Sequence, residues 1–214
     1  MTRALIMVVL LALVAASVTA AATPKPDAHD RALAQQLAAK VESLKTLTSA
    51  SNSGDDRITK ELKGCTSLGK TPADSFAVVF AMLPVLLIDI VNEIRPVLLD
   101  IRNTVAAMHP HDPVFRRWLA AERAGVDEIL TFDNHGKRID YCAAAKVMLA
   151  KTPSDAQIRS VLGVDPAKIK SLFSGASNKA SATVTKLNPQ MRAFLIAAGV
   201  RRSVAIQLTT QSPG

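Results

Sequence analysis

The fold is decided by residues 72–108, which read PADSFAVVFAMLPVLLIDIVNEIRPVLLDIRNTVAAM. Apolar side chains recur there every three or four residues, as on one face of an α-helix, while the charged and amide side chains fall on the other side. Proline normally kinks or breaks a helix, yet the period passes through Pro84 and Pro96 without a change of phase. We therefore expect one long bent helix, or two or three nearly collinear pieces.

The first part of this segment, Phe76–Ile88, holds thirteen residues without a polar side chain. Such a run is too short to cross a bilayer and predicts a central helix that is buried on several sides. The alternative is an apolar groove that binds lipid.

Five further signals predict where helices begin. In each, a short oxygen-bearing residue precedes proline, which fits an N-cap followed by the first helical residue. Since only 4% of the chain is aromatic, the composition also favours helices over a β-sandwich. The five pairs are Thr71-Pro72, Asp112-Pro113, Thr152-Pro153, Asp165-Pro166 and Asn188-Pro189.

The predicted fold class is all-α. It is a helical bundle with one long Pro-kinked central helix and a disulfide, followed by short C-terminal helices. We divide the chain into a signal peptide (1–22), a bundle domain (27–151), a short basic helical segment packed on or beside it (152–202) and a flexible tail (203–214). The expected helices cover about 27–47, a short stretch ending near Cys65, 72–108, 113–134, 137–151, 153–162, 166–174, 177–187 and 189–198.

The N-terminus has the layout of a secretory signal peptide. Arg3 supplies a positive start, Ala4–Ala16 is an unbroken apolar run, and small residues up to Ala22 offer a cleavage site. We expect a secreted, periplasmic or cell-envelope protein with no transmembrane span in the mature chain.

Cys65 and Cys142 are the two cysteines, and 76 residues lie between them. They do not form a C-x-x-C pair, so a thioredoxin-like redox site is not supported. In an oxidising compartment the pattern predicts a structural disulfide.

The charge is unevenly distributed along the sequence. Residues 137–214 hold 12 Lys/Arg against 3 Asp/Glu, a net of +9, whereas residues 1–136 hold 14 against 15. A basic segment outside the cell attracts anionic lipid or an anionic envelope polymer, although it is also compatible with a solvated surface that has no dedicated partner.

Two places offer site chemistry. His109 and His111, next to Asp112, are candidate ligands for zinc or copper, with Asp133 and His135 as further donors if the helices fold back; the alternative is an ordinary turn between helices. Glu122 falls on the apolar face of its helix, where a buried carboxyl would have a raised pKa or pair with Lys146.

Residues Ala156–Phe173 locally resemble a helix-turn-helix, with Gly163 in the turn and Lys168 and Lys170 on the second helix. That resemblance implies DNA binding. Arg159 departs from the pattern, because the motif usually has a small residue there, and the signal peptide argues against a nucleic-acid partner.

No nucleophile elbow, phosphate-binding loop or dinucleotide-binding motif occurs, and no cofactor is indicated. The sequence favours an exported, non-enzymatic binding or structural protein for an apolar or anionic ligand. The alternatives are a helix-turn-helix-like DNA-binding protein and an enzyme without a recognisable motif.

Overall fold

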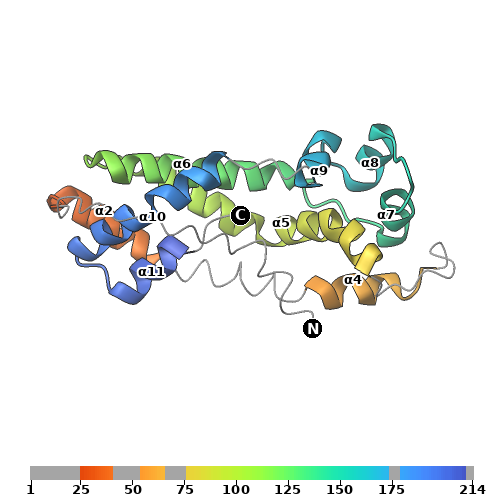
Figure 1. The fold of residues 1–214 in the computed structure, drawn as a ribbon, viewed down its shortest axis with the longest axis horizontal. Coiled ribbons are helices and arrows are strands. Elements are labelled where there is room, and N and C mark those ends of the chain that lie inside the picture. Colours follow the sequence, from red (N-terminus) through yellow and green to blue (C-terminus); the bar gives the residue numbers. More distant parts are fainter. Residues whose placement is uncertain (1–24, 41–53, 66–75, 174–178, 211–214) are drawn as a thin grey trace. The chain divides into compact units, whose positions relative to one another are not determined.

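The structure is a computed structural model that describes residues 25–40, 54–65, 76–173 and 179–210 (Figure 1). Within these ranges the regular elements are helices and no strand occurs, which confirms the predicted all-α class. The predicted signal peptide and the Thr71-Pro72 helix start lie outside the described residues.

The helix α5 (Phe76–Ala107) is the longest element, at 32 residues, and contains both Pro84 and Pro96. The prediction of one long helix is therefore confirmed. In its second half the predicted apolar face is buried, as Ile94, Leu98 and Val105 show, whereas in its first half the buried residues, Val78 and Met82, lie on another side of the helix. Three expected members of that face, Phe76, Phe80 and Leu83, are instead among the exposed large apolar residues.

The chain forms two compact units, and each combines segments that are distant in sequence. Unit 1 consists of Met1–Val41, Thr104–Gly125 and Ser177–Gly214, and unit 2 consists of Glu42–Asn103 and Val126–Ala176. This partition differs from our division at residues 151/152, because the long helix and the one after it each contribute residues to both units.

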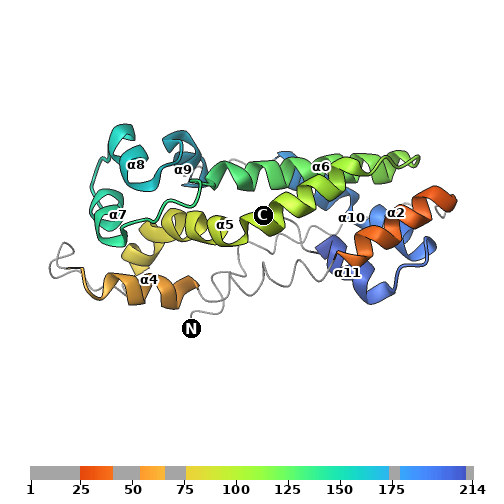
Figure 2. The same ribbon diagram turned by 180° about the vertical axis from the view of Figure 1, so that it is seen from behind.

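Unit 2 holds the first part of α5 together with α4 (Gly54–Leu62), the end of α6 (Pro113–Ile129), the 3-10 turn η3 (Leu130–Phe132), α7 (Tyr141–Met148), α8 (Asp155–Leu162) and α9 (Pro166–Phe173). The helices α7, α8 and α9 lie together in both views (Figures 1 and 2). The Cys65–Cys142 disulfide, with a Cα–Cα distance of 5.3 Å, links the end of α4 to α7. The core includes Ile58, Leu62, Ile88, Ala144, Leu162 and Ile169.

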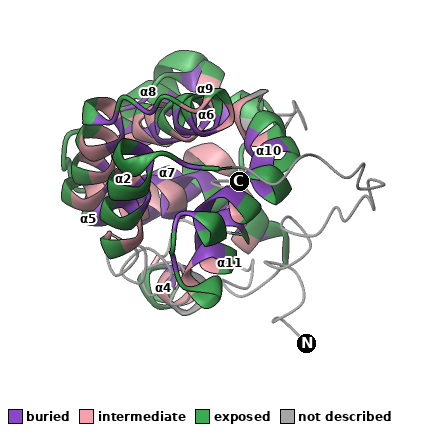
Figure 3. Ribbon diagram, turned by 90° about the vertical axis from the view of Figure 1, so that its left-hand side faces the viewer, coloured by how far each residue is buried: buried purple, intermediate pink, exposed green. Residues whose placement is uncertain are grey.

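Unit 1 holds α2 (Ala28–Ala39), the start of α6, α10 (Lys179–Ala197) and α11 (Arg202–Thr210). The helices α10 and α11 contact each other and α11 contacts α2. The rings of Phe115 on α6 and Phe194 on α10 lie 5.1 Å apart, and the indole N–H of Trp118 donates to Asn188 Oδ1 at 2.9 Å. Figure 3 shows the buried residues of α10 and α11 among their exposed ones.

Two of the five predicted helix starts are confirmed. The helix α6 begins at Pro113, where Asp112 Oδ1 accepts from the backbone N–H groups of Val114 and Phe115 at 2.8 Å. The helix α9 begins at Pro166, where Asp165 accepts from the N–H of Ala167.

Two predicted starts are wrong. Ser154, rather than Thr152, caps α8, because Ser154 and Gln157 form a reciprocal capping box. The helix α10 passes through Pro189 without a break, so the expected pieces 177–187 and 189–198 are one helix. Asn188 is buried as the acceptor for Trp118 instead of capping a helix.

Two other boundaries also require correction. The helix expected from Lys137 begins at Tyr141, because Asp140 caps it through the N–H groups of Cys142 and Ala143. Residues 203–210 of the expected flexible tail belong to α11, where Ala205 and Leu208 are buried. The last four residues lie outside the described part of the chain.

Candidate functional site

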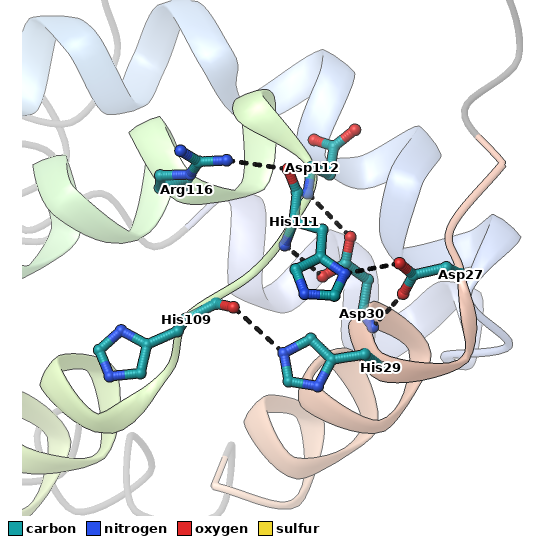
Figure 4. A network of polar contacts seen from close by, with 7 residues as sticks. All are labelled: Asp27, His29, Asp30, His109, His111, Asp112 and Arg116. Carbon is teal, nitrogen blue, oxygen red and sulfur yellow. Dashed lines mark hydrogen bonds and ion pairs between the residues drawn. The ribbon is translucent and has the colours of Figure 1, made fainter.

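A cluster of polar side chains in unit 1 joins the N-terminus of α2 to the loop between α5 and α6. We call it the His111 cluster, and it consists of Asp27, Asp30 and His111, with His29 stacked on His111 at 4.6 Å between ring centroids (Figure 4). One potential ligand atom from each of the first three residues lies within 4.8 Å of the others. The sequence separates these partners by more than 80 positions.

Asp30 is the buried member of the cluster. Its two carboxylate oxygens accept from the backbone N–H groups of His111 and Asp112 at 2.8 and 2.9 Å. Asp27 caps α2 through the N–H of Asp30, and its other oxygen lies 2.8 Å from His111 Nδ1. Backbone N–H donation by Asp30 and the neighbouring His111 lower the pKa of Asp27, while Asp27 raises the pKa of His111.

These contacts bear on the predicted metal site. The structure groups His111 with Asp27 and Asp30, whereas His109 takes part through its backbone carbonyl, which lies 3.1 Å from His29 Nε2 (Figure 4). Asp133 and His135 belong to unit 2, where Asp133 pairs with Arg95. One histidine and two carboxylates are donor groups that bind divalent ions such as Zn²⁺. However, both oxygens of each carboxylate already accept a hydrogen bond or form an ion pair, so the cluster is complete as a polar link between two segments.

Glu122 has an unusual environment. It lies on α6 one turn after Trp118, and its Oε1 is fully enclosed without a hydrogen-bond partner in the described structure. Burial raises the pKa of Glu122 to about 8. The partner expected from the sequence, Lys146, is exposed on α7 and belongs to unit 2.

An apolar stripe runs along the N-terminal part of α5 in unit 2. It consists of Phe76, Phe80 and Leu83, which are 66%, 47% and 39% exposed and share one helix face at spacings of four and three residues. The rings of Phe76 and Phe80 stack at 6.0 Å. By length and composition α5 could cross a membrane, although 44% of its most apolar window is buried inside the protein.

The resemblance of Ala156–Phe173 to a helix-turn-helix extends to its geometry. The helices α8 and α9 are joined through Gly163, which has a φ of +73°. Two of its three basic side chains form ion pairs, however: Lys170 pairs with Asp155 at 2.6 Å and Arg159 lies 3.8 Å from Asp165. These ion pairs compete with any contact to phosphate.

Sequence reasoning missed the buried amides of unit 2. Asn134 Nδ2 donates to the carbonyls of Lys137 and Leu162 at 3.0 Å, and its Oδ1 accepts from Asn92 at 2.8 Å. In the same unit, the Tyr141 hydroxyl donates to Asp89. Burial is the main cause that raises the pKa of Tyr141, and the hydrogen bond to Asp89 raises it further. The available sequence signal was the run Asn134-His135-Gly136, whose residue types are typical of a turn. In the structure His135 and Gly136 do have positive φ.

Comparisons with protein-family models, with curated proteins and with solved structures found no match. The functional argument therefore depends on the residues of this chain.

Proposed function

We propose that this chain is an exported, non-enzymatic protein of the cell envelope or extracellular space that associates with a lipid bilayer through the apolar stripe. The observation that carries the proposal is the exposure of Phe76, Phe80 and Leu83 on one face of α5. Large apolar side chains that gather on a surface mark contact sites for protein, ligand or membrane.

The two halves of α5 support this assignment. In the C-terminal half, the exposed positions hold no large apolar side chain; they are Glu93, Pro96, Asp100, Asn103 and Ala107. In the N-terminal half, the positions most open to water are apolar, and no polar side chain interrupts residues 76–88. A helix that met only water would have no reason to change its outer face in this way.

Charge favours a bilayer over another apolar partner. The chain carries a net charge of +8, and anionic headgroups concentrate basic proteins at a membrane surface. Docking on the bilayer surface fits better than spanning it, because much of α5 is already buried against unit 2.

Two features support export. One is the predicted leader over residues 1–22, and the other is the Cys65–Cys142 disulfide, which forms and persists in oxidising compartments. Mass spectrometry of the exported chain, with and without reductant, tests both at once. A cytosolic chain that still begins at Met1 and carries two free thiols would contradict export.

Vesicle flotation tests the lipid contact. We expect the mature, disulfide-bonded protein to float with phosphatidylcholine vesicles and the Phe76→Ser/Leu83→Ser variant to lose affinity. From the exposed fractions, the two side chains contribute about 2 kcal/mol, or about thirtyfold in partitioning.

Ile196→Ser/Ile206→Ser is the matched control. These isoleucines are 42% and 39% exposed on α10 and α11, outside the apolar stripe. The control should float like the natural protein. Equal loss in both variants, or no flotation of the natural protein, would contradict the proposal.

A further inference from the structure

We propose that unit 1 binds the phosphate-bearing anionic headgroups of a lipid surface through exposed cations on α2 and at the start of α11. The choice of a bilayer as partner rests on the proposed function, but the residues are different and are tested separately. The basis is the distribution of charge over the two units.

The entire net charge of the protein belongs to unit 1. Its three segments hold 12 Lys/Arg, one of which is Arg3 in the predicted leader, against 4 Asp/Glu, a net of +8. Unit 2 holds 14 against 14 and is neutral. Because segments far apart in sequence fold together, this separation is sharper than the one visible along the chain.

The few carboxyl groups of unit 1 are all directed inward or used as caps. Asp30 is buried and accepts two backbone N–H groups, Asp27 caps α2 and contacts His111, and Asp112 caps α6. Glu122 has an enclosed carboxyl oxygen. Of the four, Asp27 alone is exposed, and its carboxylate is already paired with His111.

The cations, in contrast, are exposed. Residues 177–214 contain no acidic residue, and the exposed basic side chains of unit 1 extend over α2, α6, α10 and α11. The turn before α11 lies against α2, because Gln35 Nε2 is 3.8 Å from the place that a Cβ on Gly199 would occupy. Arg31 lies one helical turn before Gln35 on α2, so it is close to this contact. The exposed cations of this region are Lys25, Arg31, Arg201 and Arg202.

Arg201 and Arg202 are unfavourably placed for stability. They lie at the N-terminus of α11, where the helix dipole is positive and acidic residues are preferred, and the first turn holds none. An anionic group bound there would be stabilised by the guanidinium groups and by the dipole together. The guanidinium group suits phosphate oxygens because it can donate two parallel hydrogen bonds.

The test measures the binding of mature, disulfide-bonded protein to vesicles of phosphatidylcholine with and without phosphatidylglycerol. The variant Arg31→Gln/Arg201→Gln/Arg202→Gln removes three charges from unit 1. The control Arg138→Gln/Lys146→Gln/Lys151→Gln removes three exposed charges from unit 2. Each cation near an anionic surface is worth about fivefold in affinity, so the unit 1 variant should lose about a hundredfold on anionic vesicles.

The expected result is this loss in the unit 1 variant, a nearly unchanged control, and unchanged residual binding to pure phosphatidylcholine. Far-UV circular dichroism establishes that both variants are folded, and the unit 1 variant should be at least as stable as the natural protein. Equal loss in the control would overturn the proposal, as would equal binding of all three proteins.

Two further arms distinguish other sources of the anion. Competition by inorganic phosphate at matched ionic strength should leave vesicle binding intact, whereas its abolition would indicate a site for free phosphate. Tighter binding to a random DNA duplex than to anionic vesicles at the same salt would also overturn the assignment. The two proposals can fail separately. If the Phe76→Ser/Leu83→Ser variant floats like the natural protein while the unit 1 variant loses binding to anionic vesicles, the proposed function is wrong and the charge contact is supported.

Discussion

Glu122 carries a buried, unpaired carboxyl oxygen, so its protonation affects the stability of unit 1. Its pKa rises from 4.5 in the unfolded chain to about 8 in the fold. Between these values the folded state binds more protons than the unfolded state, so the free energy of unfolding falls as pH rises. We expect Glu122→Gln to have little effect at pH 4.5 and to stabilise the protein by up to about 4 kcal/mol at pH 8–9.

Urea unfolding followed by fluorescence of Trp118 measures this effect, because that residue is the single tryptophan and is buried one turn away. Glu128→Gln on the same helix is the control, since Glu128 is exposed. Destabilisation by Glu122→Gln at pH 8–9 would contradict this prediction, because it would show that the carboxyl is ionised and paired.

The contact between His111 and Asp27 makes stability depend on pH in two ranges. At low pH the free energy of unfolding rises with pH, the opposite of the Glu122 effect, and at high pH it falls with pH, as it does for Glu122. The raised pKa of His111 makes its contact with Asp27 fully stabilising below 6.5 and lost as pH rises through the raised value. The lowered pKa of Asp27 makes the contact stabilising above 3.8 and lost on further acidification. His111→Ala should therefore lower the melting temperature most between pH 4 and 6.5, and progressively less as the pH rises further.

His109→Ala is the matched control, because the ring of His109 is not part of the His111 cluster.

The natural protein, His111→Ala and His109→Ala also test the metal prediction. Since the cluster is complete without an ion, we expect no change in melting temperature up to high micromolar Zn²⁺. A Zn²⁺-dependent rise in the natural protein that His111→Ala abolishes would instead establish a metal site.

Residue-level prediction succeeded where the signal was local. The apolar position of Glu122 follows from the helical period alone, and its burial is what the period predicts. Asp30 was missed because its role depends on two backbone N–H groups that lie 81 and 82 positions away. Asn188 was misassigned for a similar reason, since its neighbour Pro189 indicated a cap while its real partner, Trp118, lies 70 positions away.

Among the elements, α4 and α7 depend most on a covalent link. The disulfide between Cys65 and Cys142 joins two helices of nine and eight residues, which are too short to be stable alone. The Cys65→Ser/Cys142→Ser variant should lose about 2–5 kcal/mol, because the unfolded chain regains the freedom of a loop of 76 intervening residues. Urea unfolding followed by far-UV circular dichroism measures the change.

Reduction of the natural protein should give the same loss as the double serine variant, and reductant should have no effect on the variant itself. Equal stability with and without reductant would mean that the link adds nothing to the packing of Ile58, Leu62 and Ala144.

At this scale the sequence predicted the existence of helices better than their ends. The helix α5 continues through two prolines as predicted, and α10 continues through Pro189, where a break was expected. The buried side of α5 was predicted less well, because Val78 and Met82, and not Phe76, are buried at its start. Asp-Pro pairs marked true starts, whereas at Thr152-Pro153 a better cap lay two residues later in Ser154 and Gln157. Choosing between neighbouring caps requires the reciprocal hydrogen bonds that only the folded backbone provides.

For the whole molecule, the concentration of charge in unit 1 has a consequence for stability that is independent of any partner. Without the predicted leader, unit 1 holds eleven basic residues against four acidic ones; the excess cations repel each other in the folded state, and added salt screens that repulsion. The melting temperature monitored by Trp118, which belongs to unit 1, should therefore rise with sodium chloride concentration. In Arg31→Gln/Arg201→Gln/Arg202→Gln the rise should be smaller and the melting temperature at low salt higher. The control variant Arg138→Gln/Lys146→Gln/Lys151→Gln in neutral unit 2 should keep the natural salt dependence.

The same salt that stabilises the fold should weaken its binding to anionic vesicles, because one set of cations opposes folding and drives association. If salt left the melting temperature unchanged while it abolished vesicle binding, the cations that bind lipid would have to be other than those that repel one another in unit 1.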